Sequence, residues 1–112
     1  MAAPYNPPVK GEDFITGIAL MDMSNSGRMK ASPTIASGDF RISKDGGAWA
    51  FLATLPSVEP TSGSPDEGYD YRVKITLSAT EMNADNVFVI WHDQTDPPEW
   101  ADGFLAIVTT SA

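Results

Sequence analysis

The most constraining feature of this sequence is a strict alternation of apolar and polar residues over Tyr69–Leu77. Every odd position there holds Tyr, Val, Ile or Leu, and every even position holds Asp, Arg, Lys or Thr. A period of two places all the apolar side chains on one side of a β-strand, whereas a helix would scatter them around its circumference. The segment is therefore predicted to be a strand with one buried face and one solvated face.

Other segments show the same preference for strands, and turn residues lie between them. Asp45-Gly46 is a typical hairpin turn, because glycine tolerates the positive φ that such turns require. The run 87–91 is continuously apolar and short, as in a central strand of a sandwich. Beyond 69–77, the predicted strands are 14–20, 39–43, 48–52, 87–91 and 104–108.

The remaining segments are predicted to be connections. Ser78 and Glu81 have the spacing of a capping box, so one short helical turn is expected over 78–82. The prolines at 33, 56, 60, 65, 97 and 98 all fall between predicted strands, where a missing N–H breaks no ladder. The stretch 56–68 is predicted to be a long loop rich in Pro, Ser, Gly and acidic residues.

These elements predict an all-β chain folded as a small immunoglobulin-like β-sandwich, with a small barrel as the alternative. Residues 12–112 would form this single domain. Residues 1–11 contain Pro4, Pro7 and Pro8, which favour an extended N-terminal arm. The arm is either a frayed terminus or a tether that orders on a partner by burying Tyr5 and Val9.

Charge and composition exclude several classes of function. The chain of 112 residues carries a net charge of −8, which argues against nucleic acid as a ligand because phosphate binding needs clustered Lys and Arg. The absence of Cys excludes disulfides, thiol catalysis and cysteine-based zinc sites. No apolar run is long enough for a membrane helix, and no signal peptide is evident at the start. No membrane association is expected.

The sequence offers little support for catalysis or a cofactor. His92 precedes Asp93, and a base oriented by that carboxylate or a metal site with Asp96, Glu99 and Asp102 is conceivable. A solvated acidic loop is the better interpretation of these residues, since no second His and no Cys accompany them. The acidic groups at 66–70 and 83–86 lack the calcium-loop pattern of an EF-hand, and no nucleophile elbow or phosphate loop is present. We therefore expect no enzyme activity and no cofactor.

The aromatic residues are the best candidates for a binding surface. Trp91 and Phe51 are predicted to be core, whereas Trp49 lies just past the hairpin turn and Trp100 follows Pro-Pro in a loop. Aromatic residues at such positions are common in protein interfaces and in saccharide-stacking platforms. The methionines at 21, 23 and 29 are either core filler or part of a contact surface.

Three stretches together resemble small structural proteins and modules of tailed bacteriophages. They are an apolar strand with a Ser-Lys-Asp-Gly-Gly hairpin at 38–49, a strand ending in Leu-Ser-Ala-Thr-Glu within 73–85, and the apolar strand 87–91. The resemblance spans about residues 12–108. It implies an immunoglobulin-like sandwich used in virion assembly, with no catalytic residues to carry over.

Three functions are consistent with these observations. The resemblance favours a virion structural protein, above all a capsid decoration or cement protein present in many copies, because the chain ends soon after its last predicted strand. The alternative positions are the neck, the tail or the fibre base, and the expected partner is the major capsid protein or another virion protein. The second function is a glycan- or receptor-binding module using Trp49 and Trp100, and the third is a metal hydrolase built on His92. For the first function, the N-terminal arm is expected to anchor the chain on the major capsid protein through Tyr5, Pro7, Pro8, Val9 and Phe14. Trp49 and Trp100 are the further candidate partner-binding residues.

Overall fold

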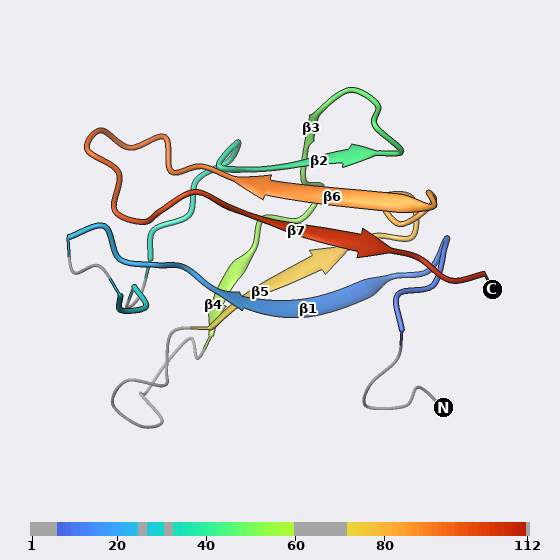
Figure 1. The fold of residues 1–112 in the computed structure, drawn as a ribbon, viewed down its shortest axis with the longest axis horizontal. Helices are drawn as coiled ribbons and strands as arrows, with labels where there is room; N and C mark the ends of the chain where they lie inside the picture. Colours follow the sequence, from blue (N-terminus) through green and yellow to red (C-terminus); the bar gives the residue numbers. More distant parts are fainter. Residues whose placement is uncertain (1–6, 25–26, 31–32, 60–71, 112) are drawn as a thin grey trace.

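A computed structural model describes residues 7–24, 27–30, 33–59 and 72–111 and shows seven strands in two layers (Figure 1). No helix occurs among the described residues. The strands are β1 (Phe14–Ala19), β2 (Phe40–Lys44), β3 (Ala50–Phe51), β4 (Ser57–Glu59), β5 (Arg72–Leu77), β6 (Asn86–Trp91) and β7 (Gly103–Val108).

The strands form two antiparallel sheets, one with the order β1-β5-β4 and the other with the order β3-β2-β6-β7. Strands 1, 4 and 5 thus lie in one layer, and strands 2, 3, 6 and 7 lie in the other. The predicted all-β sandwich is confirmed.

The core lies between the two layers and is supplied by alternate residues of the long strands. In β5, Val73, Ile75 and Leu77 are fully buried, as the alternation over 69–77 predicted. Tyr69 and Tyr71, at the start of that pattern, lie outside the described residues. The other buried apolar residues are Leu20, Phe40, Ile42, Met82, Ala84, Val87, Val89, Trp91, Trp100 and Ile107.

The predicted hairpin turn is present between β2 and β3. Asp45 and Gly46 both have positive φ, at 50° and 75°, as a type I′ turn requires. The N–H of Gly47 donates to the carbonyl of Lys44 at 2.8 Å and closes the turn. The second arm of the hairpin is shorter than predicted, because only Ala50 and Phe51 pair with β2.

Two predictions about local structure are wrong, and a third is met only in part. Residues 78–82 form a single turn, in which the N–H of Met82 donates to the carbonyl of Ser78 at 2.9 Å and both capping-box bonds between Ser78 and Glu81 are made, and no helix continues from it. The segment predicted as a loop from Pro56 contains β4, which pairs with β5. Phe51, predicted to be core, is 56% exposed because it lies on an edge strand and points away from the other sheet.

The N-terminal segment is attached to the sandwich from residue 8 onwards. Val9 pairs in parallel with Thr110, whose N–H donates to the carbonyl of Pro8 and whose carbonyl accepts from Lys10. The N–H of Gly11 donates to the carbonyl of Met82 at 3.0 Å. Residues 8–11 are therefore held on the folded body and are not a free arm, which shortens the arm predicted over 1–11. Residues 1–6 lie outside the described part of the chain.

Candidate functional site

The outer side of the sheet β3-β2-β6-β7 is apolar and exposed. No other layer of described residues covers it, because the core lies on its opposite side (Figure 1). Side chains on each strand alternate between the two sides, so those between the core residues of β6 and β7 face outward. We call the resulting surface the outer face. It consists of Trp49, Phe51, Phe88, Ile90, Phe104 and Val108.

Three aromatic rings cross this face in a continuous row. The ring of Trp49 meets that of Phe88 edge-on, with 5.9 Å between centroids. Phe88 in turn stacks on Phe104 with centroids 5.4 Å apart and an interplanar angle of 19°. The flanking rings remain open to solvent, with Trp49 50% exposed and Phe104 64% exposed. These contacts hold the rings in fixed positions while leaving one side of each available.

A cationic side chain, that of Arg41, lies on the same side of the sheet. It is paired across the strands with Phe51 on β3 and with Ile90 on β6. Its guanidinium lies 5.1 Å from the centroid of the Phe51 ring, and its Nε donates to the carbonyl of Gly38 at 3.2 Å. The side chain is thus positioned by a cation–π contact and a hydrogen bond, and its terminal N–H groups remain available.

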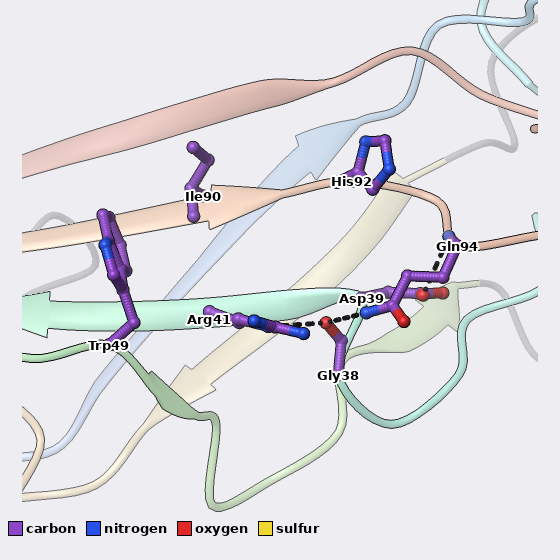
Figure 2. Close-up of a pocket in the computed structure, with 7 residues that line it drawn as sticks. All are labelled: Gly38, Asp39, Arg41, Trp49, Ile90, His92 and Gln94. Atoms are coloured by element: carbon purple, nitrogen blue, oxygen red, sulfur yellow. Dashed lines mark hydrogen bonds between the residues drawn. The ribbon is translucent and has the colours of Figure 1, made fainter.

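One end of the outer face is hollowed (Figure 2). The carbonyl of Gly38 accepts from both Arg41 and the Gln94 amide, the latter at 2.7 Å. The carboxylate of Asp39 accepts from the backbone N–H groups of Ala36 and Gln94. The hollow is open and measures about 520 Å³, and it is lined by Gly38, Asp39, Arg41, Trp49, Ile90, His92 and Gln94.

This arrangement is suited to binding. Exposed contiguous apolar surface is uncommon on soluble proteins and marks interaction sites. Aromatic residues and Arg, the types present here, are those enriched at the centres of protein interfaces. The described residues contain no group of three or more His, Asp or Glu side chains that could hold a metal ion.

Trp49 and Trp100, which the sequence suggested as a pair of contact residues, lie in different environments. Trp49 belongs to the outer face. Trp100 is fully buried, its ring centroid lies 5.9 Å from that of Phe40, and its indole N–H donates to the carbonyl of Thr34 at 3.2 Å. The prediction that Trp100 contacts a partner or saccharide is therefore wrong. An indole inside this sandwich fills the core and satisfies its single donor.

The predicted contact residues near the N-terminus are also divided. Phe14 begins β1 and is partly buried against the core. Pro8 and Val9 are partly buried against the body, and Pro7 is exposed. Tyr5 lies outside the described residues. Of the predicted contact residues near the N-terminus that the structure describes, only Pro7 is fully exposed.

His92 has a different carboxylate partner from the one expected. Its Nδ1 lies 2.6 Å from an oxygen of Asp102, and both side chains are exposed. Asp93 is instead buried, and its carboxylate accepts from the backbone N–H groups of Thr95 and Glu99. The idea of a base oriented by Asp93 is therefore wrong. The Asp93 carboxylate stabilises the loop between β6 and β7.

Most of the outer face was not predicted from the sequence. Phe88 and Ile90 lie within the run 87–91, which is predicted to be a central strand, and Phe104 and Val108 lie within the last predicted strand, 104–108, for which no exposed apolar side is predicted. A signal was nevertheless present. The sequence predicts no helix of more than one turn, so no layer is available to cover a second apolar side of those strands.

Comparisons with known proteins give no relatives: no family model, no curated protein and no solved structure matches this chain. The part of the chain that the structure describes contains no helix long and apolar enough to cross a membrane.

Proposed function

We propose that this chain is a non-enzymatic virion structural protein of a tailed bacteriophage, and that it decorates the capsid by binding the major capsid protein through its outer face. The observation that carries the proposal is the contiguous row of Trp49, Phe88 and Phe104 rings, of which the two outer ones are exposed. The resemblance of the hairpin and of the strands around it to phage structural modules supplies the class of partner. An adaptor at the neck, tail or fibre base would use the same surface.

The physical properties of the chain suit attachment in many copies. Removing apolar surface from water contributes about 25 cal/mol per Å² before the costs of association, so a few half-exposed rings give only modest affinity. Copies bound side by side on a symmetric shell would convert a modest contact into firm attachment. The net charge of −8 keeps the unbound protein soluble despite its apolar face.

The N-terminal segment is a second proposed contact. Residues 1–6 contain Tyr5 and precede the point at which the chain is held on the body by Thr110. An extended segment attached at one end can lie on a neighbouring subunit and bury an aromatic side chain there. Because residues 8–11 are bonded to the sandwich, only the residues before them are proposed to act as the arm.

A matched pair of variants tests attachment through the outer face. Phe104→Ser removes a 64% exposed ring from this face, and Ile15→Ser removes a 61% exposed side chain from β1 on the other sheet. Both variants should remain folded by circular dichroism. In a pull-down with purified capsids that lack this protein, Phe104→Ser should lose at least tenfold in affinity, whereas Ile15→Ser should bind as the unmodified chain does.

The arm is tested separately by deleting residues 1–6. Weaker coating with an unchanged unfolding midpoint would support the arm as a second contact. Full coating by the deletion variant would leave the outer face as the sole proposed contact. Equal binding by Phe104→Ser and Ile15→Ser would contradict attachment through the outer face.

Saccharide binding is the second candidate function, and the hollow in Figure 2 favours it. Trp49 offers a ring face on which a sugar can stack, while Arg41 offers N–H donors and the Gln94 amide oxygen offers an acceptor. Saturable binding of a bacterial surface polysaccharide by calorimetry, lost in Gln94→Leu and retained in Phe104→Ser, would establish this function. Absence of heat at millimolar saccharide would exclude it.

A further inference from the structure

The open edge of β7 presents a regular set of backbone hydrogen-bonding groups. Beyond the strand, the N–H of Thr109 donates to Asp85 on the β6 side, and the N–H and carbonyl of Thr110 bond to the segment at Pro8–Lys10 on the other side. Backbone groups alternate in direction along a strand, and the register between β6 and β7 is uninterrupted. The N–H and carbonyl groups of Phe104, Ala106 and Val108 therefore point away from β6.

The described residues of this strand carry none of the usual protection against pairing. Strand β7 is the last strand of its sheet, and no described strand pairs with its outer side. The sequence Gly-Phe-Leu-Ala-Ile-Val contains no charge and no proline. Proteins normally protect exposed edges with charged side chains, prolines or bulges, so an uncharged, regular edge of six residues is typical of a strand that pairs with another chain.

The described part of the N-terminal segment covers only the far end of this edge. Val9 lies beside Thr110 in parallel, so the next bond along the ladder would join the N–H of residue 8 to the carbonyl of Val108. Residue 8 is proline and has no N–H. Among the described residues, the ladder ends at Thr110. The segment Pro8–Lys10 occupies the edge beyond that point and limits where an incoming strand can lie.

The edge is complementary to itself. In an antiparallel pair of two β7 strands centred on Ala106, the residues facing each other are Ala106 with Ala106, and Phe104 with Val108. All of these residues direct their backbone groups toward the open edge, as hydrogen-bonded pairs require. The same register sets Phe104, 64% exposed, beside Val108, 72% exposed, on the outer side of the sheet. Contact between these side chains would remove both from water.

We propose that β7 pairs with β7 of a second copy, antiparallel and centred on Ala106, which joins two four-stranded sheets into one continuous sheet. Six backbone hydrogen bonds, two from each of about three facing pairs, would form across the two-fold axis. The outer faces of the two copies would then be continuous, with a Phe104 on each side of the axis. The proposal does not depend on attachment to a capsid, because it concerns the isolated chain in solution.

Charge gives the proposed dimer a distinctive salt dependence. Each copy carries a net charge of −8, so pairing brings two acidic molecules together. The strand itself is uncharged, and the repulsion comes from the rest of the chain. Salt screens such repulsion, with a Debye length of about 10 Å at 0.1 M. The dimer should therefore strengthen between low and high ionic strength, unlike an association held by opposite charges.

Sedimentation velocity of the full chain tests the proposal. A concentration series at low and high salt should show a reversible monomer–dimer equilibrium that shifts toward dimer as salt is added. Ala106→Glu places two carboxylates at the two-fold axis and should weaken the dimer at least tenfold. The matched control is Ile15→Glu, at an exposed position of the other sheet, which should associate as the unmodified chain does.

Crosslinking identifies the edge of the sheet through which two copies pair. It gives this information even if Ala106→Glu alters folding. The chain has no Cys, so a single Cys in place of Ala106 is a unique reporter at the axis, and Ala50→Cys reports on β3 at the opposite edge of the same sheet. A short bismaleimide should link Ala106→Cys into dimers far more efficiently than Ala50→Cys. A chain that stays monomeric at all concentrations and salt levels, or crosslinking equal at both positions, would overturn the proposal.

Discussion

The indole ring of Trp91 lies directly over Gly103, the residue opposite it on β7. A Cβ added at position 103 would come within 2.5 Å of the indole Nε1 and 2.7 Å of Cε2. The ring is 7% exposed and packs against Phe40 with 5.5 Å between centroids. Gly103 therefore makes room for the side chain that closes one end of the core.

Gly103→Ala should destabilise the protein by about 1–3 kcal/mol, the usual cost of overpacking a well-filled site. The free energy of unfolding in urea measures the loss. Trp91→Phe supplies the control, because phenylalanine lacks the indole atoms that the new methyl group would strike. In a chain that already carries Trp91→Phe, Gly103→Ala should lower the free energy of unfolding by a smaller amount. An equal cost in both backgrounds would show that the contact with Trp91 is not the cause.

Trp100 and Trp49 should respond oppositely to truncation. Trp100→Ala removes a fully buried ring and its hydrogen bond to Thr34, which should cost about 3–5 kcal/mol. Trp49→Ala removes a half-exposed ring whose main described contact is with Phe88, so its cost should be about 1 kcal/mol or less. Thermal unfolding of both variants tests the difference. Equal melting temperatures would contradict the assignment of Trp100 to the core.

Asp93 should make the protein less stable in acid. Burial by itself raises the pKa of this carboxyl, but hydrogen bonds from Thr95, Glu99 and Trp100 together outweigh burial and hold the pKa below its ordinary value. A carboxyl with a lowered pKa in the folded state stabilises the fold above its unfolded pKa, about 4. That contribution disappears as the pH falls through the folded value.

The variant Asp93→Asn tests this pH dependence. It should be less stable than the unmodified chain at pH 7, and the difference should shrink as the pH falls below about 4. Urea unfolding at a series of pH values measures the difference directly. If the difference in free energy of unfolding between the two proteins stays constant down to pH 2, the ionised form of Asp93 does not contribute to stability.

Glu81 joins two parts of the chain that are far apart in sequence. One carboxylate oxygen accepts from the N–H of Ser78 and the other accepts from the N–H of Ala53, both at 2.9 Å. The residue is only 8% exposed. Glu81→Ala leaves both partners unsatisfied and should cost about 2–4 kcal/mol. Glu81→Gln keeps one acceptor oxygen. Its free energy of unfolding, measured by chemical denaturation, should lie between those of the unmodified chain and of Glu81→Ala. A Gln variant as unstable as the Ala variant would contradict this division.

Sequence patterns predicted the long strands well because each has strong local signals. The alternation in β5 and the Asp45-Gly46 turn both specify local geometry through the residues that make it. Strand β4 escaped prediction because Ser57–Glu59 is short and lies between prolines, and only its pairing with β5 makes it a strand. Such an element depends on tertiary context, which local propensity does not contain.

The candidate site was harder to predict, since exposure depends on which layers exist. Trp100 follows two prolines, a typical loop signal, yet the loop returns its ring to the core beside Phe40. Phe51 and Phe104 have the residue type of core positions, yet they lie on edge strands whose outer side is not covered by any described layer. Hydrophobicity alone predicts burial for Trp100 and equally for Phe51 and Phe104. Only the arrangement of the sheets shows that Trp100 is buried and the two phenylalanines are exposed.

Electron cryomicroscopy of the particle that carries this protein tests the central claim most directly. The account predicts ordered copies on the capsid, with Trp49, Phe88 and Phe104 buried against the major capsid protein. Copies confined to the neck or tail with the same face buried would retain the outer face as the contact and change only the partner. An outer face directed to solvent, with the protein attached through the sheet β1-β5-β4, would contradict the account.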